Sequence, residues 1–313
     1  MRIKTTLAID RTTTLDINGS SQRIRVCAAR EGLPPLLVVQ AGPALPVLHE
    51  LAKFQRLLNL EQDFLVGYWE QRGCGDAPRK DANSASWRQQ IDDLRSVLTW
   101  FHGETKQGVI MLGISIGGTM ALRAAEHEAS RVKAVVAISP DSHTAGSDAA
   151  SYDFLQDRAL RGGSRRLSRR VATLKPPPYL TPAALQRRTG LLADLGTIEH
   201  ERTFGALLRE MLVGMVGVYG IVGTMRALRN INLVLRRLLP EIVSLDLFAN
   251  PPRLTMPVHY VFGEQDALNP PSIADRLPAA IAAPGSMAVR VPDAGHMVHF
   301  DRPDVVRSVV ERA

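Results

Sequence analysis

The feature that most constrains the fold is a serine flanked by glycines, at the point where a strand-like run passes into a helix-like pattern. The apolar run 108–112 precedes Gly113-Ile114-Ser115-Ile116-Gly117, and a helical pattern follows from Gly118. Strand and helix pass close together at such a turn, so the residues beside the serine must be small. The helix start also directs backbone N–H groups toward charge that develops next to the serine. The segment predicts a nucleophilic Ser115 on an α/β sheet.

Strand-like and helix-like segments alternate along most of the chain, which predicts a mainly parallel, doubly wound sheet covered on both faces. Near the N-terminus, residues 3–9 and 23–28 alternate in polarity and predict two further strands, with a hairpin turn at Asn18-Gly19. Helical spacing occurs at 45–58 and 86–102. The apolar runs that predict buried strands are 36–40, 64–69, 132–139, 258–262 and 287–291.

The alternation stops between residues 141 and 250. This stretch contains the breaker Pro176-Pro177-Pro178 and long apolar helical patterns, and it is net basic. At 313 residues the chain is long enough for one large α/β domain with an insertion. We therefore expect a core formed by residues 1–140 and 251–313, and a helical cap formed by residues 141–250.

The composition excludes several other classes of protein. The net charge is +7, but no aromatic–basic interleaving or nucleic-acid motif is present. The chain has two cysteines, too few for a disulfide framework, and no Cys/His spacing typical of a metal site. The apolar stretch 211–223 is too short to span a bilayer, and the N-terminus lacks a signal-peptide pattern. We expect a cytoplasmic protein with no cofactor and with neither nucleic acid nor membrane as partner.

One basic cluster has two interpretations, a solvated helix face or a docking patch for an acidic partner such as a carrier protein, or for an anionic substrate. The cluster consists of Arg158, Arg161, Arg165, Arg166, Arg169 and Arg170.

A serine nucleophile needs a base and an orienting acid, and both are found after predicted strands. Asp266 follows the strand 258–262 and His296 follows the strand 287–291. The carboxyl ends of parallel strands meet at one edge of a sheet. The chain order Ser115, Asp266, His296 is that of the α/β-hydrolase triad. The alternatives to these two assignments are Glu264 or Asp93 as the acid and His299 as the base.

An acyl-transfer intermediate also needs donors for its oxyanion. The backbone N–H of Ile116, directly after the serine, is one candidate. Gly42 is the other, in the loop Gln40-Ala41-Gly42-Pro43-Ala44 after the strand 36–40. We expect Gly42 and Ile116 to form the oxyanion hole.

The segment Tyr68-Trp69-Glu70-Gln71-Arg72-Gly73-Cys74-Gly75 resembles the Gln-Arg-Gly-x-Gly segment of proline iminopeptidase-like α/β hydrolases. The serine turn, Phe262-Gly263-Glu264-Gln265-Asp266 and Ala294-Gly295-His296 extend the resemblance over most of the chain. It implies the α/β-hydrolase fold, a helical cap over the active site, a triad of Ser115, Asp266 and His296, and no cofactor. Two segments depart from the family pattern, since Gln40-Ala41-Gly42-Pro43-Ala44 replaces its His-Gly-Gly-Pro-Gly loop and Ile116 replaces a tryptophan.

The leading hypothesis is a serine hydrolase that cleaves an ester, thioester or amide of a small apolar or anionic substrate, which a carrier protein could hold. A lyase or cyclase on the same fold is the first alternative, with His296 as base and Ser115 only positioning the substrate. A proline iminopeptidase-type aminopeptidase is the second, and it would use acidic cap residues to hold a free amine; Glu199, Glu201 and Glu210 are the residues available. A catalytically silent binding protein is the third.

Overall fold

A computed structural model describes residues 7–42, 44–162 and 164–313 and shows one eight-stranded sheet. The strand order is β1-β2-β4-β3-β5-β6-β7-β8, and every neighbouring pair from β4 to β8 is parallel. Only the pairs β1–β2 and β2–β4 are antiparallel. The strands are β1 Ile9–Ile17, β2 Ser20–Ala28, β3 Pro35–Val39, β4 Leu65–Trp69, β5 Val109–Ile114, β6 Val132–Ile138, β7 Val258–Gly263 and β8 Met287–Val291.

The first hairpin corrects one expectation and confirms another. The turn does lie at Asn18-Gly19, where both residues have positive φ, as a tight hairpin requires. The strand before it is Ile9–Ile17 and not 3–9, because its residues pair one to one with Ser20–Ala28. Residues 3–6 of the expected strand lie outside the described residues.

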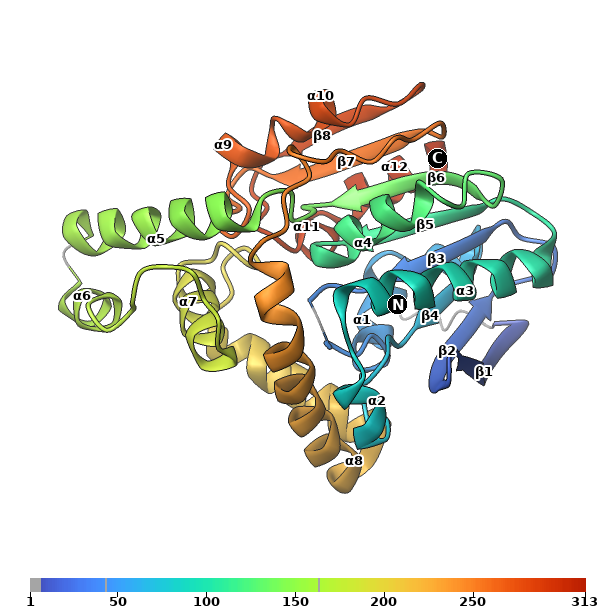
Figure 1. Ribbon diagram of the computed structural model, residues 1–313, viewed down its shortest axis with the longest axis horizontal. Helices are drawn as coiled ribbons and strands as arrows, with labels where there is room; N and C mark the ends of the chain where they lie inside the picture. Colours follow the sequence, from blue (N-terminus) through green and yellow to red (C-terminus); the bar gives the residue numbers. More distant parts are fainter. Residues whose placement is uncertain (1–6, 43, 163) are drawn as a thin grey trace, which may run out of the picture.

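Both faces of the sheet are covered by helices, as the apolar strands require (Figure 1). In β3, Leu37 and Val39 join one buried cluster, while Leu36 and Val38 join the other. The first cluster includes α3 (Trp87–Thr105), α4 (Ile116–Ala125), α9 (Pro271–Ala274) and α10 (Leu277–Ala280). The second includes α1 (Leu51–Leu57), α11 (Val298–Asp301) and α12 (Pro303–Arg312). Shorter connecting helices are η1 (Leu48–Glu50), η2 (Leu60–Gln62) and α2 (Arg79–Asn83).

Four helices separate β6 from β7 along the described chain, and they lie beyond the carboxyl ends of the strands (Figure 1). They are α5 (Thr144–Arg161), α6 (Arg165–Val171), α7 (Pro182–Asp194) and α8 (Phe204–Ile242). Helix α8 breaks at Gly220, where φ is 66° and ψ is −179°, and its two arms form a V.

Within the described chain, α8 is the single helix that is long and apolar enough to cross a membrane, judged by length and composition. The apolar stretch 211–223 was expected to be too short for this, but the helix that contains it runs from Phe204 to Ile242, with the break at Gly220. Apolar side chains near the break are open to solvent: Val213, Ile221 and Met225 are 67%, 71% and 60% exposed. Other positions of α8 face inward, among them Met215, Ala227 and Val234.

Candidate active site

Ser115 lies at the turn between β5 and α4, and its backbone has φ 54° and ψ −127°. Side chains are rarely found in this conformation, so the turn presents Ser115 on a strained backbone. The flanking glycines are required by close contacts. A Cβ on Gly117 would lie 2.3 Å from the carbonyl oxygen of Val39, and one on Gly113 would lie 2.6 Å from Cα of Gly118. The sequence pattern therefore has a direct steric cause.

Three predicted residues from three strand ends come together at this turn. His296 Nε2 lies 2.8 Å from Ser115 Oγ, and His296 Nδ1 lies 2.8 Å from Asp266 Oδ2. Asp266 and His296 are 2% and 3% exposed. The other carboxylate oxygen of Asp266 accepts the backbone N–H groups of Leu268 and Asn269, both at 2.9 Å. These bonds fix the carboxylate, which in turn orients the imidazole.

The alternative acids and base lie elsewhere. Glu264 is exposed, and Asp93 forms an ion pair with Arg72 at 2.7 Å. His299 is fully buried and stacks on Phe54, with ring centroids 5.3 Å apart. Burial lowers the pKa of His299 well below its ordinary value, so this imidazole stays neutral. Only His296 lies within hydrogen-bond distance of Ser115 among the candidates that the sequence offered.

The two residues expected at the oxyanion hole lie beside Ser115. Gly42 and Ile116 line the same cavity as the serine. Gly42 has a φ of 66°, and Ile116 is the first residue of α4, so its N–H belongs to the unpaired first turn. Pro43 of this loop lies outside the described residues.

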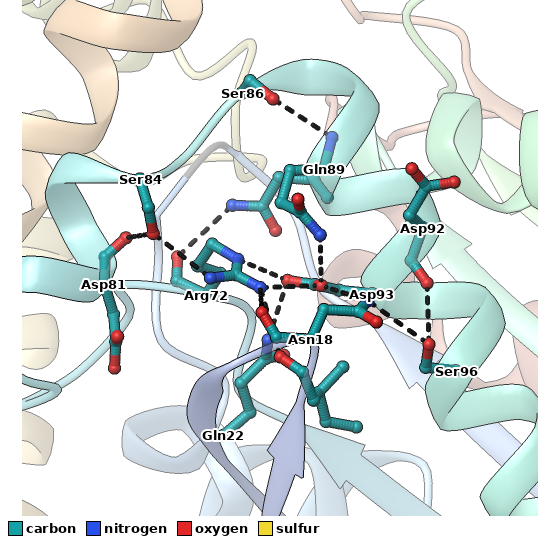
Figure 2. Close-up of polar contacts among 12 residues, drawn as sticks. Asn18, Gln22, Arg72, Asp81, Ser84, Ser86, Gln89, Asp92, Asp93 and Ser96 are labelled. Carbon is teal, nitrogen blue, oxygen red and sulfur yellow. Dashed lines mark hydrogen bonds and ion pairs between the residues drawn. The ribbon is translucent and has the colours of Figure 1, made fainter.

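The segment Glu70-Gln71-Arg72 follows β4, and each of its three side chains forms hydrogen bonds with a different part of the fold. Glu70 accepts a hydrogen bond from Tyr219 of α8. Gln71 donates to the carbonyl of Gln40, in the loop that carries Gly42. Arg72 donates both Nε and Nη2 to the buried carboxylate of Asp93 on α3 (Figure 2). Its other bonds reach two carbonyls at the β1–β2 turn and the hydroxyl of Ser84.

The cavity over Ser115 has a volume of about 510 Å³, and most of its wall surface is apolar. Both arms of α8 contribute to it, since Leu208 and Met211 come from the first arm and Ile231 and Leu235 from the second. A cavity of this size and character suits a small molecule with an apolar part.

Sequence reasoning missed a polar group in this wall. Asp148 of α5 and Arg188 of α7 form an ion pair at 3.2 Å, and the Arg188 guanidinium lies 5.3 Å from the ring centroid of Tyr179. All three residues are at least 95% buried and line the cavity. The sequence does contain a sign that Arg188 is buried, because it lies three residues after Leu185 and three before Leu191, on the apolar face of its helix.

Asp141, at the end of β6, also lines the cavity. Burial, and secondarily the nearby Asp148 carboxylate, raise the pKa of Asp141 to about 6.

The acidic residues considered for amine binding are already paired or exposed. Lys53 Nζ lies 2.7 Å and 2.9 Å from the two carboxylate oxygens of Glu199, and both residues are buried. Glu210 is bound by Arg202 at 2.5 Å and lies 3.3 Å from Lys53. The side chain of Glu201 is 85% exposed.

The basic cluster lies at the end of α5 and along α6, away from the sheet (Figure 1). Arg161 and Arg170 pair with Asp157 and Asp194, while Arg158 lies over the ring of Phe154. Arg165, Arg166 and Arg169 are exposed.

Among the described residues, no group of three His, Cys, Asp or Glu side chains lies close enough together to hold a metal ion.

Comparison with known proteins extends these observations. The family model of the alpha/beta hydrolase family matches residues 49–309. A probable aminopeptidase YbaC of Bacillus subtilis (strain 168) is 22% identical over 303 residues, which cover 95% of this chain and 94% of that protein.

Solved structures show the same fold at low identity. Proline iminopeptidase of Mycobacterium smegmatis has a TM-score of 0.66 and 18% identity, covering 96% of this chain and 97% of that one. A thermophilic esterase from Thermogutta terrifontis has a TM-score of 0.62 and 18% identity, covering 97% of each chain. The expected resemblance to proline iminopeptidase-like proteins is confirmed, and these relatives support a hydrolytic enzyme of open specificity. With the family model matching most of its length, the chain belongs to the alpha/beta hydrolase family.

Proposed function

We propose that this protein is a serine hydrolase that cleaves an ester or thioester of an apolar acyl group through a Ser115–His296–Asp266 triad. The observation that carries the proposal is the pair of 2.8 Å contacts that join Ser115 to His296 and His296 to Asp266. His296 takes the proton of Ser115 as its Oγ attacks the substrate carbonyl, and then donates this proton to the leaving group. Water then attacks the acyl-enzyme in the same way, with His296 again taking a proton and returning it to the leaving Ser115. Asp266 keeps the imidazole oriented and stabilises its cation.

The oxyanion that forms during both steps would be held by the N–H groups of Ile116 and Gly42. Donors of this kind contribute about 3–4 kcal/mol each in measured enzymes, because they are fixed before charge develops. Gln71, which bonds to the carbonyl of Gln40, steadies the loop on the Gly42 side. Helices α5 to α8 act as a cap that excludes water and selects the substrate.

The pairing of Glu199 and Glu210 favours an ester over a peptide with a free N-terminus. An aminopeptidase of this family would need an acidic side chain for the substrate's ammonium group. Lys53 already neutralises Glu199, and Arg202 neutralises Glu210. A cationic substrate would have to displace one of these built-in cations, which charge complementarity disfavours.

Ser115→Ala should lower turnover of p-nitrophenyl esters at least 1000-fold and abolish labelling by a fluorophosphonate. Ser139→Ala is the matched control, because Ser139 is also buried but does not line the cavity. A parallel panel of aminoacyl p-nitroanilides tests the aminopeptidase alternative. Full activity in Ser115→Ala would overturn the assignment of the nucleophile.

A lyase or cyclase is favoured by one observation, the departure of the Gln40-Ala41-Gly42 loop from the family pattern. Mass spectrometry separates the two reactions, since a hydrolase should show an acyl group on Ser115 after rapid quenching, and a lyase forms no such adduct.

The exposed Arg165, Arg166 and Arg169 support a further proposal, that an acidic carrier protein presents the acyl group. Replacing all three by glutamate should then raise KM for a carrier-bound substrate but leave KM for a free ester unchanged.

A further inference from the structure

Two buried hydrogen-bond donors in the cavity wall have no role in the triad. Tyr179 is 1% exposed and Arg188 is 5% exposed. Within the described part of the chain, neither Tyr179 Oη nor Arg188 Nε has a hydrogen-bond partner. Groups of this kind are rare in folded proteins, because a buried polar atom without a partner destabilises the fold. Their position in the wall of the active-site cavity suggests that a ligand supplies the missing acceptor.

The chemistry of a bound ligand matters, because a purely apolar chain would leave both donors without a hydrogen-bond acceptor. Both atoms are almost closed to solvent in the free protein. A hydrocarbon chain lying over Ser115 offers no acceptor to Arg188 Nε or to the Tyr179 hydroxyl. An acyl chain with an oxygen at the same level would supply one.

The surrounding charges decide which kind of oxygen fits. Arg188 already faces Asp148, and Asp141 lies in the same cavity wall. A carboxylate on the substrate would bring a third negative charge to a single cation. An ammonium group cannot accept a bond from either donor. A neutral carbonyl or hydroxyl oxygen can accept a hydrogen bond from a donor of this kind without adding charge.

We propose that Tyr179 and Arg188 form a specificity subsite that binds a neutral carbonyl or hydroxyl oxygen on the acyl chain of the substrate. This inference rests on the proposed esterase function and names its substrate class. The subsite is held in place by three elements of the cap, because Asp148 belongs to α5, Arg188 to α7, and Tyr179 to the segment before α7.

The test compares p-nitrophenyl heptanoate with its 4-oxo, 5-oxo and 6-oxo derivatives, which differ only in one CH₂ replaced by a carbonyl. At least one oxo ester should exceed heptanoate about 10- to 100-fold in kcat/KM, as expected for a hydrogen bond to a charged donor. An ester of the same length that ends in a carboxylate should react more slowly than the preferred oxo ester.

Tyr179→Phe removes only the hydroxyl group, so the ratio of oxo ester to heptanoate should fall about 3- to 10-fold. Its Tm should stay the same or rise, since the lost hydroxyl has no partner in the fold, and this separates the effect from misfolding. Tyr152→Phe is the matched control, because Tyr152 packs in the same cluster but does not line the cavity. It should change neither the ratio nor Tm.

Each result has one meaning. Equal rates for heptanoate and all oxo esters, or an unchanged ratio in Tyr179→Phe, would overturn the subsite while leaving the esterase function intact. If no ester is hydrolysed, the esterase proposal fails. Calorimetric binding of the same esters to the unreactive protein then tests the subsite by itself, and it is rejected if the oxo esters bind no more tightly than heptanoate.

Discussion

Replacing Arg72 by methionine should destabilise the protein strongly, although Arg72 does not line the active-site cavity. Arg72 is 3% exposed, and its guanidinium makes five hydrogen bonds. Two of them go to Asp93, which is fully buried (Figure 2). Methionine fills part of the same volume but leaves the Asp93 carboxylate without its cation.

The expected cost is worked from these contacts. Breaking a buried ion pair by removing one partner typically costs 3–5 kcal/mol, because the other charge stays buried. The value here should lie near the lower end, about 3 kcal/mol, since the amides of Asn18, Gln22 and Gln89 still donate to Asp93. For a chain of this size, about 2 °C of Tm per kcal/mol gives a loss of about 6 °C.

The assay is chemical denaturation of Arg72→Met, Asp93→Asn and the double variant. Each single variant leaves one charge unpaired, but the double variant leaves none, so its cost should be at least about 2 kcal/mol smaller than the sum. Arg11→Met is the matched control, because Arg11 and Glu104 form an exposed pair expected to contribute less than about 1 kcal/mol. Additive effects, or a loss in Arg72→Met no larger than in the control, would refute this reasoning.

Two further predictions concern groups near the site. Asp141→Asn should raise Tm at pH 8 but hardly at pH 4. Burial raises the pKa of Asp141 from 3.8 to about 6, so the ionised carboxylate destabilises the fold increasingly as pH rises through this interval, by up to about 3 kcal/mol. Fluorimetric melting across this pH range checks it, and a constant difference would contradict it. His296→Ala should lower kcat/KM for esters at least 1000-fold, whereas His299→Leu should lower it less than 5-fold, because His299 lies in the core beside Phe54. A comparable loss in both variants would reopen the choice of base.

The fold and the three residues around Ser115 could be predicted because their signals are local. The glycines of the serine turn are imposed by contacts within a few residues or with the adjacent strand. Asp266 and His296 follow strands whose ends must meet in a parallel sheet, so their proximity follows from topology. The hairpin turn at Asn18-Gly19 was predictable from its residue types, but the strand before it was placed too early.

Other features depend on packing between distant segments, which the sequence pattern does not encode. The Arg188–Asp148 pair joins α5 and α7, and Tyr179 reaches it from an irregular segment. The fold-back of α8 at Gly220 could not be distinguished from an uninterrupted apolar helix, because a glycine within a helical pattern is often tolerated. The pairing of Lys53 with Glu199 joins residues 146 positions apart.

Helix α8 contributes to the cavity wall but carries none of the three residues proposed to react, and this separation bears on how related proteins diversify. Leu208, Met211, Ile231 and Leu235 line the cavity, whereas Val213, Ile221 and Met225 of the same helix face solvent. The residues proposed to react, by contrast, stand on turns anchored to the central sheet. Under the proposed function, substitutions at the lining positions of α8 would reshape the space offered to a substrate while leaving Ser115, Asp266 and His296 in place. Such a separation lets new substrates be acquired one side chain at a time while the chemistry is inherited unchanged.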